Sequence, residues 1–203
     1  QNVDLETSSS FDIDLILKLH ERNKLDMDRM IVHNGVKTQE YLEKILEMQK
    51  AGFHNSIIVL DSKDELSRLL KLKPKRTIKV GIRMAINEEA QSAYYTSRLG
   101  IPAEEIIPFF KEHIRDNELV ELKMLHFFVD SGIKDSLYYR GELQRALQLY
   151  IELKKESKNL NSFNLGGGFP IRNHLGFEYD YEYIIGEIIK NIKEACSREK
   201  VAE

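Results

Sequence analysis

The sequence of 203 residues has one cysteine, no tryptophan, four prolines and no long apolar run. A single cysteine, Cys196, excludes an internal disulfide framework and favours a reducing, cytoplasmic location. No apolar stretch approaches the ~20 residues that a membrane-spanning helix requires. The start of the chain also lacks the basic and apolar regions of a secretory signal. We therefore expect a cytoplasmic protein with no membrane partner.

An excess of one charge is missing too. Lys and Arg number 30, Asp and Glu number 33, and the two signs are interleaved, for a net charge of -3. This balance argues against a nucleic-acid partner. His20, His54, His113 and His174 have no metal-ligand spacing with one another or with Cys196, so no metal is expected.

What the sequence does contain is a repeated alternation of short β-branched runs with longer segments of helical apolar spacing. Strands separated by helices run parallel and are buried on both faces, so the pattern predicts one α/β domain over residues 1–203. Helix starts are indicated at Thr38, at Asp61-Ser62 with Glu65 three residues beyond, and at Pro102. The expected strands are 2–5, 30–32, 56–60, 77–84, 121–129 and 162–165, with a long irregular segment at 85–98.

Six such units fit either an open doubly wound sheet or a (β/α)8 barrel that lacks two units. A closed barrel typically takes ~250 residues. The chain starts at Gln1 rather than Met, as expected of a trimmed segment. Both architectures remain open on the pattern alone.

Three consecutive glycines, Gly166, Gly167 and Gly168, directly follow the last expected strand. Glycines add no packing and cost chain entropy, so they are expected where the backbone closely approaches a ligand. Their N–H groups favour an anion, usually phosphate, although a flexible hinge is the alternative. Neither the P-loop nor the Gly-x-Gly-x-x-Gly spacing is present.

Polar residues or glycines follow five successive strands at the same end. Ser131 follows the fifth and is placed to join the same anion site. Arg83 is a permanent cation in an apolar strand and suits phosphate or carboxylate, or else an internal ion pair with Glu6 or Asp130. His126 is, judged alone, better interpreted as a buried core histidine. It shares one strand face with two further candidates, Phe128 and Asp130.

Taken in order, these segments resemble the fold-type III pyridoxal-phosphate-dependent decarboxylases, and within them the biosynthetic arginine decarboxylases. The similarity spans most of the chain, and the ordered set is more specific than the glycine motif alone. The segments that carry it are Leu5-Glu6-Thr7-Ser8-Ser9-Ser10, His33-Asn34-Gly35-Val36-Lys37, Val80-Gly81-Ile82-Arg83, Ser97-Arg98-Leu99-Gly100, Leu125-His126-Phe127-Phe128-Val129-Asp130-Ser131-Gly132 and Gly166-Gly167-Gly168-Phe169-Pro170.

The resemblance implies an incomplete TIM-type (β/α)8 barrel of the alanine-racemase-like kind that binds pyridoxal 5'-phosphate. It implies a decarboxylase that converts arginine to agmatine and CO2 and forms a homo-oligomer. The lysine that carries the cofactor and the C-terminal β-domain are then expected outside residues 1–203, so this part alone is expected to be inactive. The implied cofactor-binding residues are Gly166, Gly167, Gly168, Ser131, Arg83, Phe128, His126 and Glu6.

Three positions depart from the family's pattern. Phe128 stands where the resemblance implies a histidine that stacks on the cofactor, Asp130 replaces a glycine, and Asn164 replaces an aspartate. An aromatic ring still stacks, but Phe128 cannot donate a hydrogen bond or a proton. Two alternatives therefore stay open beside decarboxylation of arginine or another basic amino acid (ornithine, diaminopimelate or carboxynorspermidine). One is a non-catalytic cofactor-binding or phosphate-binding homologue, and the other is a phosphate-binding barrel enzyme without pyridoxal chemistry.

Overall fold

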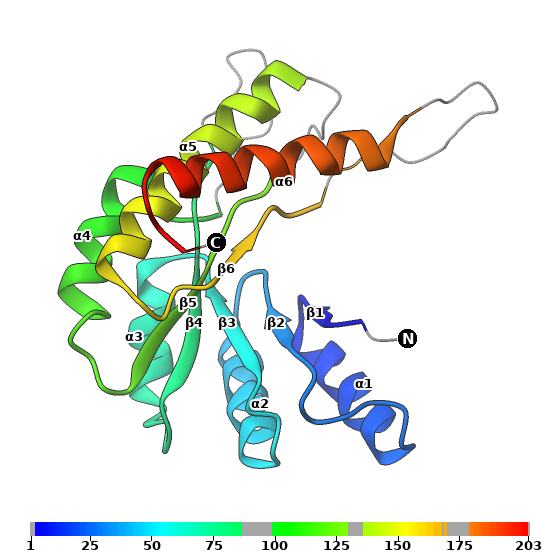
Figure 1. The fold of residues 1–203 in the computed structure, drawn as a ribbon. Helices are drawn as coiled ribbons and strands as arrows, with labels where there is room; N and C mark the ends of the chain where they lie inside the picture. Colours follow the sequence, from blue (N-terminus) through cyan, green and yellow to red (C-terminus); the bar gives the residue numbers. More distant parts are fainter. Residues whose placement is uncertain (1–2, 87–98, 130–135, 168, 170–178, 203) are drawn as a thin grey trace, which may run out of the picture.

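The computed structural model describes residues 3–86, 99–129, 136–167, 169 and 179–202. In this part of the chain, strands and helices alternate throughout (Figure 1). The strands are β1 (Leu5–Thr7), β2 (Ile31–His33), β3 (Ser56–Leu60), β4 (Ile78–Arg83), β5 (Val120–His126) and β6 (Ser162–Asn164). The helices are α1 (Ser10–Glu21), α2 (Gln39–Lys50), α3 (Lys63–Lys71), α4 (Ala103–His113), α5 (Ser136–Glu156) and α6 (Tyr181–Arg198).

All the strands are parallel and lie in the sheet in the order of the sequence, from β1 to β6. A doubly wound sheet reverses its strand order at a switch point, so that alternative is wrong. Sequential order is the arrangement of a barrel wall. The predicted incomplete barrel of six β/α units is confirmed, with helices arranged around the outside of a curved sheet (Figure 1).

Side-chain contacts show how strongly the sheet is curved. The Asn34 amide Nδ2 lies 3.1 Å from His126 Nε2, although β2 and β5 are separated by β3 and β4. In a flat sheet three strand spacings amount to about 14 Å. The direct contact between these side chains therefore requires the sheet to curl, which makes this concave face the interior of the barrel.

The two faces of the sheet have separate cores. On the convex face, residues such as Ile31, Ile58 and Leu125 join the helices in one large cluster of buried apolar side chains. On the concave face, a smaller cluster contains Val32, Ile57, Val59 and Met124. Adjacent residues of β2 and β3 thus point to opposite faces, as the period-two geometry of a strand requires.

A register shift in β5 decides which of its side chains enter the barrel. Val80 pairs with Leu122, whereas the next residue, Gly81, pairs with Met124, so Lys123 is the extra residue of a bulge. A bulge reverses the alternation beyond it. Met124 and His126 consequently point to the concave face, although Leu122 packs with the helices.

Two strand bounds expected from the sequence are wrong. The first strand is Leu5–Thr7 rather than 2–5, because pairing with β2 begins at Leu5 and Ile31. The fifth ends at His126 rather than residue 129, because its ladder with β6 ends at Asn164. Most of the irregular segment expected at 85–98 lies outside the described residues.

The predicted helix starts at 38, 61–62 and 102 agree with the structure to within a residue. Thr38 caps α2, with its hydroxyl accepting a hydrogen bond from the Tyr41 N–H at 3.2 Å. Ser62 is the N-cap residue of α3, and α4 begins directly after Pro102. Within the described residues, no helix has both the length and the apolar character needed to cross a bilayer.

The buried convex core gives a stability prediction. Leu125 is 0% exposed, whereas Leu15 on α1 is 58% exposed. Leu125→Ala leaves a cavity and should lower the free energy of unfolding by about 2–5 kcal/mol. Leu15→Ala removes the same atoms and should change it by less than about 0.5 kcal/mol. Urea unfolding of both variants measures the difference, and equal losses would show that the core is placed wrongly.

Candidate functional site

The polar residues that end or follow the strands meet at one rim of the barrel. The β3–β4 register pairs Leu60 with Ile82, so the next residues, Asp61 and Arg83, are neighbours. Arg83 in turn pairs with His126, and His126 with Asn164. Carboxyl ends of parallel strands always share an edge, and this edge is where barrel sites lie. The rim residues are Glu6, Asn34, Asp61, Arg83, His126 and Asn164.

A chain of hydrogen bonds crosses the interior at this rim. The amide of Asn34 donates to the Glu6 carboxylate at 3.1 Å, which fixes its nitrogen toward that side. The same amide nitrogen faces His126 Nε2 at 3.1 Å, so Nε2 must accept. The proton of the ring then resides on Nδ1, 3.3 Å from the Asn164 carbonyl oxygen. One neutral tautomer of His126 satisfies every contact.

Electrostatics agree with that assignment. Burial, together with the neighbouring Arg83 guanidinium, lowers the pKa of His126 to about 4, against an ordinary 6.5. His126 as a whole residue is only 2% exposed. His126 is therefore uncharged near pH 7. Its geometry fits a hydrogen-bonded structural role at the rim better than that of a proton donor.

Arg83 lies in the middle of the rim. Its Nη1 is 3.3 Å from Asp61 Oδ1, and its guanidinium carbon lies 5.8 Å from the centre of the Phe128 ring. The sequence left open the alternative that Arg83 forms an ion pair with Glu6 or Asp130. The predicted pairing with Glu6 is wrong. The Arg83 partner is Asp61, and Asp130 lies outside the described residues.

The glycine segment approaches the same place. Gly166 has φ +70°, and a Cβ there would lie 2.7 Å from the Phe127 carbonyl oxygen and 3.0 Å from the Phe128 ring. Only glycine fits this approach without strain. The Gly166 N–H donates to the Asn164 side chain at 2.8 Å, so this amide is already used within the loop. Gly167 is exposed. The predicted residues Gly168 and Ser131 lie outside the described residues.

A buried cluster behind the rim was not expected from the sequence as a site. Lys37 Nζ lies 3.4 Å from both Asp61 and Glu65, and it also donates to the Val59 carbonyl. Burial lowers the pKa of Lys37, and the two carboxylates oppose that shift. The sequence alone indicates Asp61 only as a candidate N-cap residue. Its position directly after a buried strand is visible in the sequence, whereas its pairing with Lys37, 24 positions earlier, is not.

Other polar residues near the strand ends serve the helix layer. His33 Nδ1 lies 2.7 Å from the Thr7 hydroxyl, which also contacts the Tyr41 hydroxyl. Burial lowers the pKa of His33 to about 3. His33 is thus a buried residue of β2. The Ser8 and Ser9 N–H groups donate to Asp12 at the start of α1.

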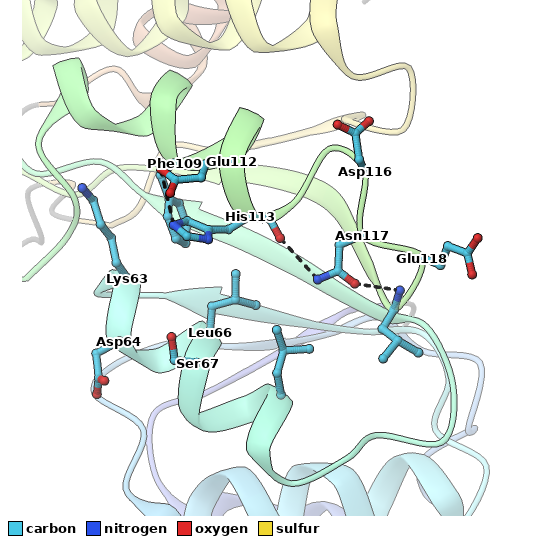
Figure 2. Close-up of a pocket in the computed structure, with 12 residues that line it drawn as sticks. Lys63, Asp64, Leu66, Ser67, Phe109, Glu112, His113, Asp116, Asn117 and Glu118 are labelled. Carbon is cyan, nitrogen blue, oxygen red and sulfur yellow. Dashed lines mark hydrogen bonds and ion pairs between the residues drawn. The ribbon is translucent and has the colours of Figure 1, made fainter.

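A groove of about 660 Å³ lies elsewhere, between α3 and α4 on the outer surface (Figure 2). Side chains of both charges line it, including Lys63, Asp64 and Glu112, and Lys63 is paired with Glu105 at 2.6 Å. None of the residues predicted for the site lines this groove. Among the described residues, no group of three or more potential metal ligands is assembled. The candidate site is therefore the rim.

A family model for the "Pyridoxal-dependent decarboxylase, pyridoxal binding domain" matches residues 2–203. The biosynthetic arginine decarboxylase of Prochlorococcus marinus (strain AS9601) is 28% identical over 209 residues, covering 96% of this chain and 32% of its own length. The chain thus spans about a third of that relative.

Two solved structures share the fold. The biosynthetic arginine decarboxylase of Campylobacter jejuni superposes with a TM-score of 0.78 at 23% identity, over 100% of this chain and 33% of its own. Diaminopimelate decarboxylase of Helicobacter pylori, complexed with L-lysine, superposes with a TM-score of 0.77 at 19% identity. The match covers 95% of this chain and 48% of the length of that one. These likenesses support the barrel architecture described above.

The neutral His126 generates a pH prediction. The pKa of His126 is about 4 in the folded protein, below the ordinary value of 6.5. The unfolded chain therefore binds the proton first, and stability is lost as pH falls from 6.5 to 4. His126→Gln keeps an acceptor for Asn34 but cannot titrate. The free energy of unfolding that this variant loses between pH 6.5 and pH 4 should therefore be smaller than the wild-type loss by about 3 kcal/mol.

Urea unfolding at pH 7 and pH 4 measures this difference. The matched control is His54→Gln, which removes an exposed histidine and should leave the pH dependence as in the wild type. An equal loss in the His126→Gln variant and the wild type would contradict the neutral assignment.

Proposed function

The chain belongs to the pyridoxal-dependent decarboxylase family, whose pyridoxal-binding domain it matches over residues 2–203, and we propose that it is the cofactor-binding part of an arginine decarboxylase. The observation that carries the proposal is the single rim where Arg83, Phe128 and Gly166 adjoin. A guanidinium, a flat aromatic face and a tight glycine loop together suit a phosphorylated aromatic ligand.

Pyridoxal 5'-phosphate, the cofactor expected from the sequence, is the cofactor of this family. The residues present fit it. The lack of a Cβ at Gly166 lets the glycine loop lie directly against the Phe127 carbonyl and the Phe128 ring, which is next to Arg83. Within the described residues, Asp61 takes one of the five N–H donors of Arg83. When bound, this cofactor supplies the electron sink that stabilises the substrate as its α-carboxylate leaves as CO2.

In this proposal, the chain's own residues bind the cofactor and orient it. The proposal assigns the phosphate to Gly166, Gly167, Gly168 and Ser131, with Gly166 shaping the loop rather than donating its own N–H, which Asn164 takes. Arg83 offers its remaining donors to an anionic group of cofactor or substrate. The Phe128 ring offers a stacking face without a proton. His126 and Glu6, joined through Asn34, keep the interior wall rigid.

Arginine is proposed as substrate because the sequence resembles that branch and the curated relative is named for it. The same proposal assigns the lysine that binds the cofactor, and a C-terminal β-domain, to segments outside residues 1–203. It also includes a cytoplasmic homo-oligomer and an inactive isolated segment. The second candidate, a non-catalytic cofactor-binding protein, is favoured by Phe128, because phenylalanine cannot hydrogen-bond to or protonate a ligand.

The substrate proposal is tested on the intact polypeptide that carries this sequence. Release of labelled CO2 should be faster from arginine than from ornithine, diaminopimelate or lysine. The kcat/KM ratio should exceed about tenfold, because a site that hydrogen-bonds a guanidinium rejects ligands that lack it. Turnover of another amino acid but not arginine overturns the assignment, and cofactor binding without any turnover supports the second candidate.

The glycine loop gives a matched pair of variants. Gly166→Ala places a Cβ 2.7 Å from a carbonyl oxygen at φ +70°, so the loop must shift. We expect the affinity for pyridoxal phosphate to fall at least about tenfold, a loss of ~1.4 kcal/mol. Gly186→Ala, in α6 with no atom within 4 Å of its Cβ, should bind normally. Fluorescence titration measures both, and unchanged binding by Gly166→Ala removes this loop from the site.

A further inference from the structure

Both carboxylate oxygens of Asp61 are committed to cations. Oδ1 lies 3.3 Å from Arg83 Nη1, and Oδ2 lies 3.4 Å from Lys37 Nζ. The Asp61 side chain is 2% exposed and that of Lys37 is 0% exposed. Water therefore has little access to this carboxylate, and the direction of its oxygens is set by the protein.

Glu65 contacts both Asp61 and Lys37. Its Oε2 accepts the Asp61 N–H at 2.9 Å, and its Oε1 accepts the Lys37 N–H at 2.9 Å. Its carboxylate is also 3.4 Å from Lys37 Nζ. Glu65 thus fixes the backbone of Asp61 and the position of Lys37, although it makes no contact with Arg83 that the structure records.

The cluster pairs cations with carboxylates. Lys37 and Arg83 flank Asp61, and Glu65 pairs with Lys37 and also lies 4.0 Å from Arg68. Removing one member of such a cluster leaves an uncompensated buried charge.

Arg83 needs such a partner because its side chain is long and flexible. An arginine loses substantial rotamer freedom when it is held in one geometry. Within the described residues, Asp61 is its ion-pair partner, and the guanidinium carbon lies 5.8 Å from the centre of the Phe128 ring. The guanidinium is thereby held at the rim, and Asp61 takes one of its five N–H donors in the described part of the chain.

We infer that Asp61 is the positioning residue that aims Arg83 into the cofactor site, and that Lys37 and Glu65 fix Asp61 for this task. The inference rests on the proposed function, since it states how the same rim is preorganised. Asp61 itself touches no cofactor atom in this account. It acts through the orientation of Arg83.

A double-mutant cycle for pyridoxal phosphate affinity in the intact polypeptide tests the inference. Asp61→Asn keeps the shape but removes the charge, and should weaken binding about tenfold. Arg83→Met should weaken it at least as much. The double variant should bind no worse than Arg83→Met alone, because Asp61 acts only through Arg83. Additive losses, or unchanged binding by Asp61→Asn, overturn the inference.

Asp116→Asn is the matched control. Asp116 also pairs with an arginine, Arg115 at 3.3 Å, but its side chain is 79% exposed and, in the described part of the chain, neither residue pairs with Lys37, Asp61, Glu65 or Arg83. Its loss should leave affinity unchanged. Should Asp61→Asn fail to fold, Asp61→Glu retains the charge and displaces the carboxylate. Weaker binding by this variant supports the inference, and wild-type binding by it overturns the inference.

A crystal structure of the Asp61→Asn variant gives a second readout. We expect the Arg83 guanidinium to leave its place beside Phe128, and an unmoved guanidinium overturns the inference. This readout needs no cofactor. Absence of pyridoxal phosphate binding in the wild type would therefore contradict the proposed function. The position of the Arg83 guanidinium in the variant would still decide the role of Asp61.

Discussion

Parallel strand direction, combined with the curl of the sheet, determines where chemistry is possible in this protein. Each strand ends at the same rim, and the curl turns the last inward residue of each toward the barrel axis. Residues far apart in sequence, such as Asn34 and His126, consequently touch. A flat sheet with the same residues would leave these side chains about 14 Å apart.

Below that rim the interior is apolar, and at the rim it is polar. Val32, Val59 and Met124 form the lower layer, and Asn34, Asp61 and His126 lie one alternation further along the same strands. Buried polar groups are tolerated in two ways here. His126 gives up its charge and accepts a hydrogen bond, whereas Lys37, whose pKa is lowered by burial, is paired with the carboxylates of Asp61 and Glu65, which oppose that shift. The result is a wall of paired polar groups at the rim, in which the Arg83 guanidinium lies near both Asp61 and the Phe128 ring.

Much of the fold follows from local sequence pattern. The apolar run of β3 and the Thr38 cap of α2 depend on neighbouring residues alone, and both agree with the prediction. The first strand and the end of the fifth were misplaced, because strand ends depend on which residues of the next strand are available for pairing. The bulge at Lys123 has no local signal, yet it determines that His126 faces inward.

The same distinction explains the site. Arg83 and the glycine segment could be selected by residue type and position, since a cation and a run of glycines are unusual at strand ends. The partner of Arg83 could not be selected in this way, because the choice of Asp61 over Glu6 depends on the register between β3 and β4. Pairing between residues distant in sequence is fixed only when the whole sheet is assembled.

The most direct measurement is a crystal structure of the intact protein with pyridoxal phosphate bound. The account predicts the phosphate against the glycine loop at Gly166 and Gly167, the ring beside Phe128 and the Arg83 guanidinium within hydrogen-bond distance of an anionic group. Cofactor bound in the outer groove between α3 and α4 (Figure 2), or anywhere away from the strand-end rim, would contradict it.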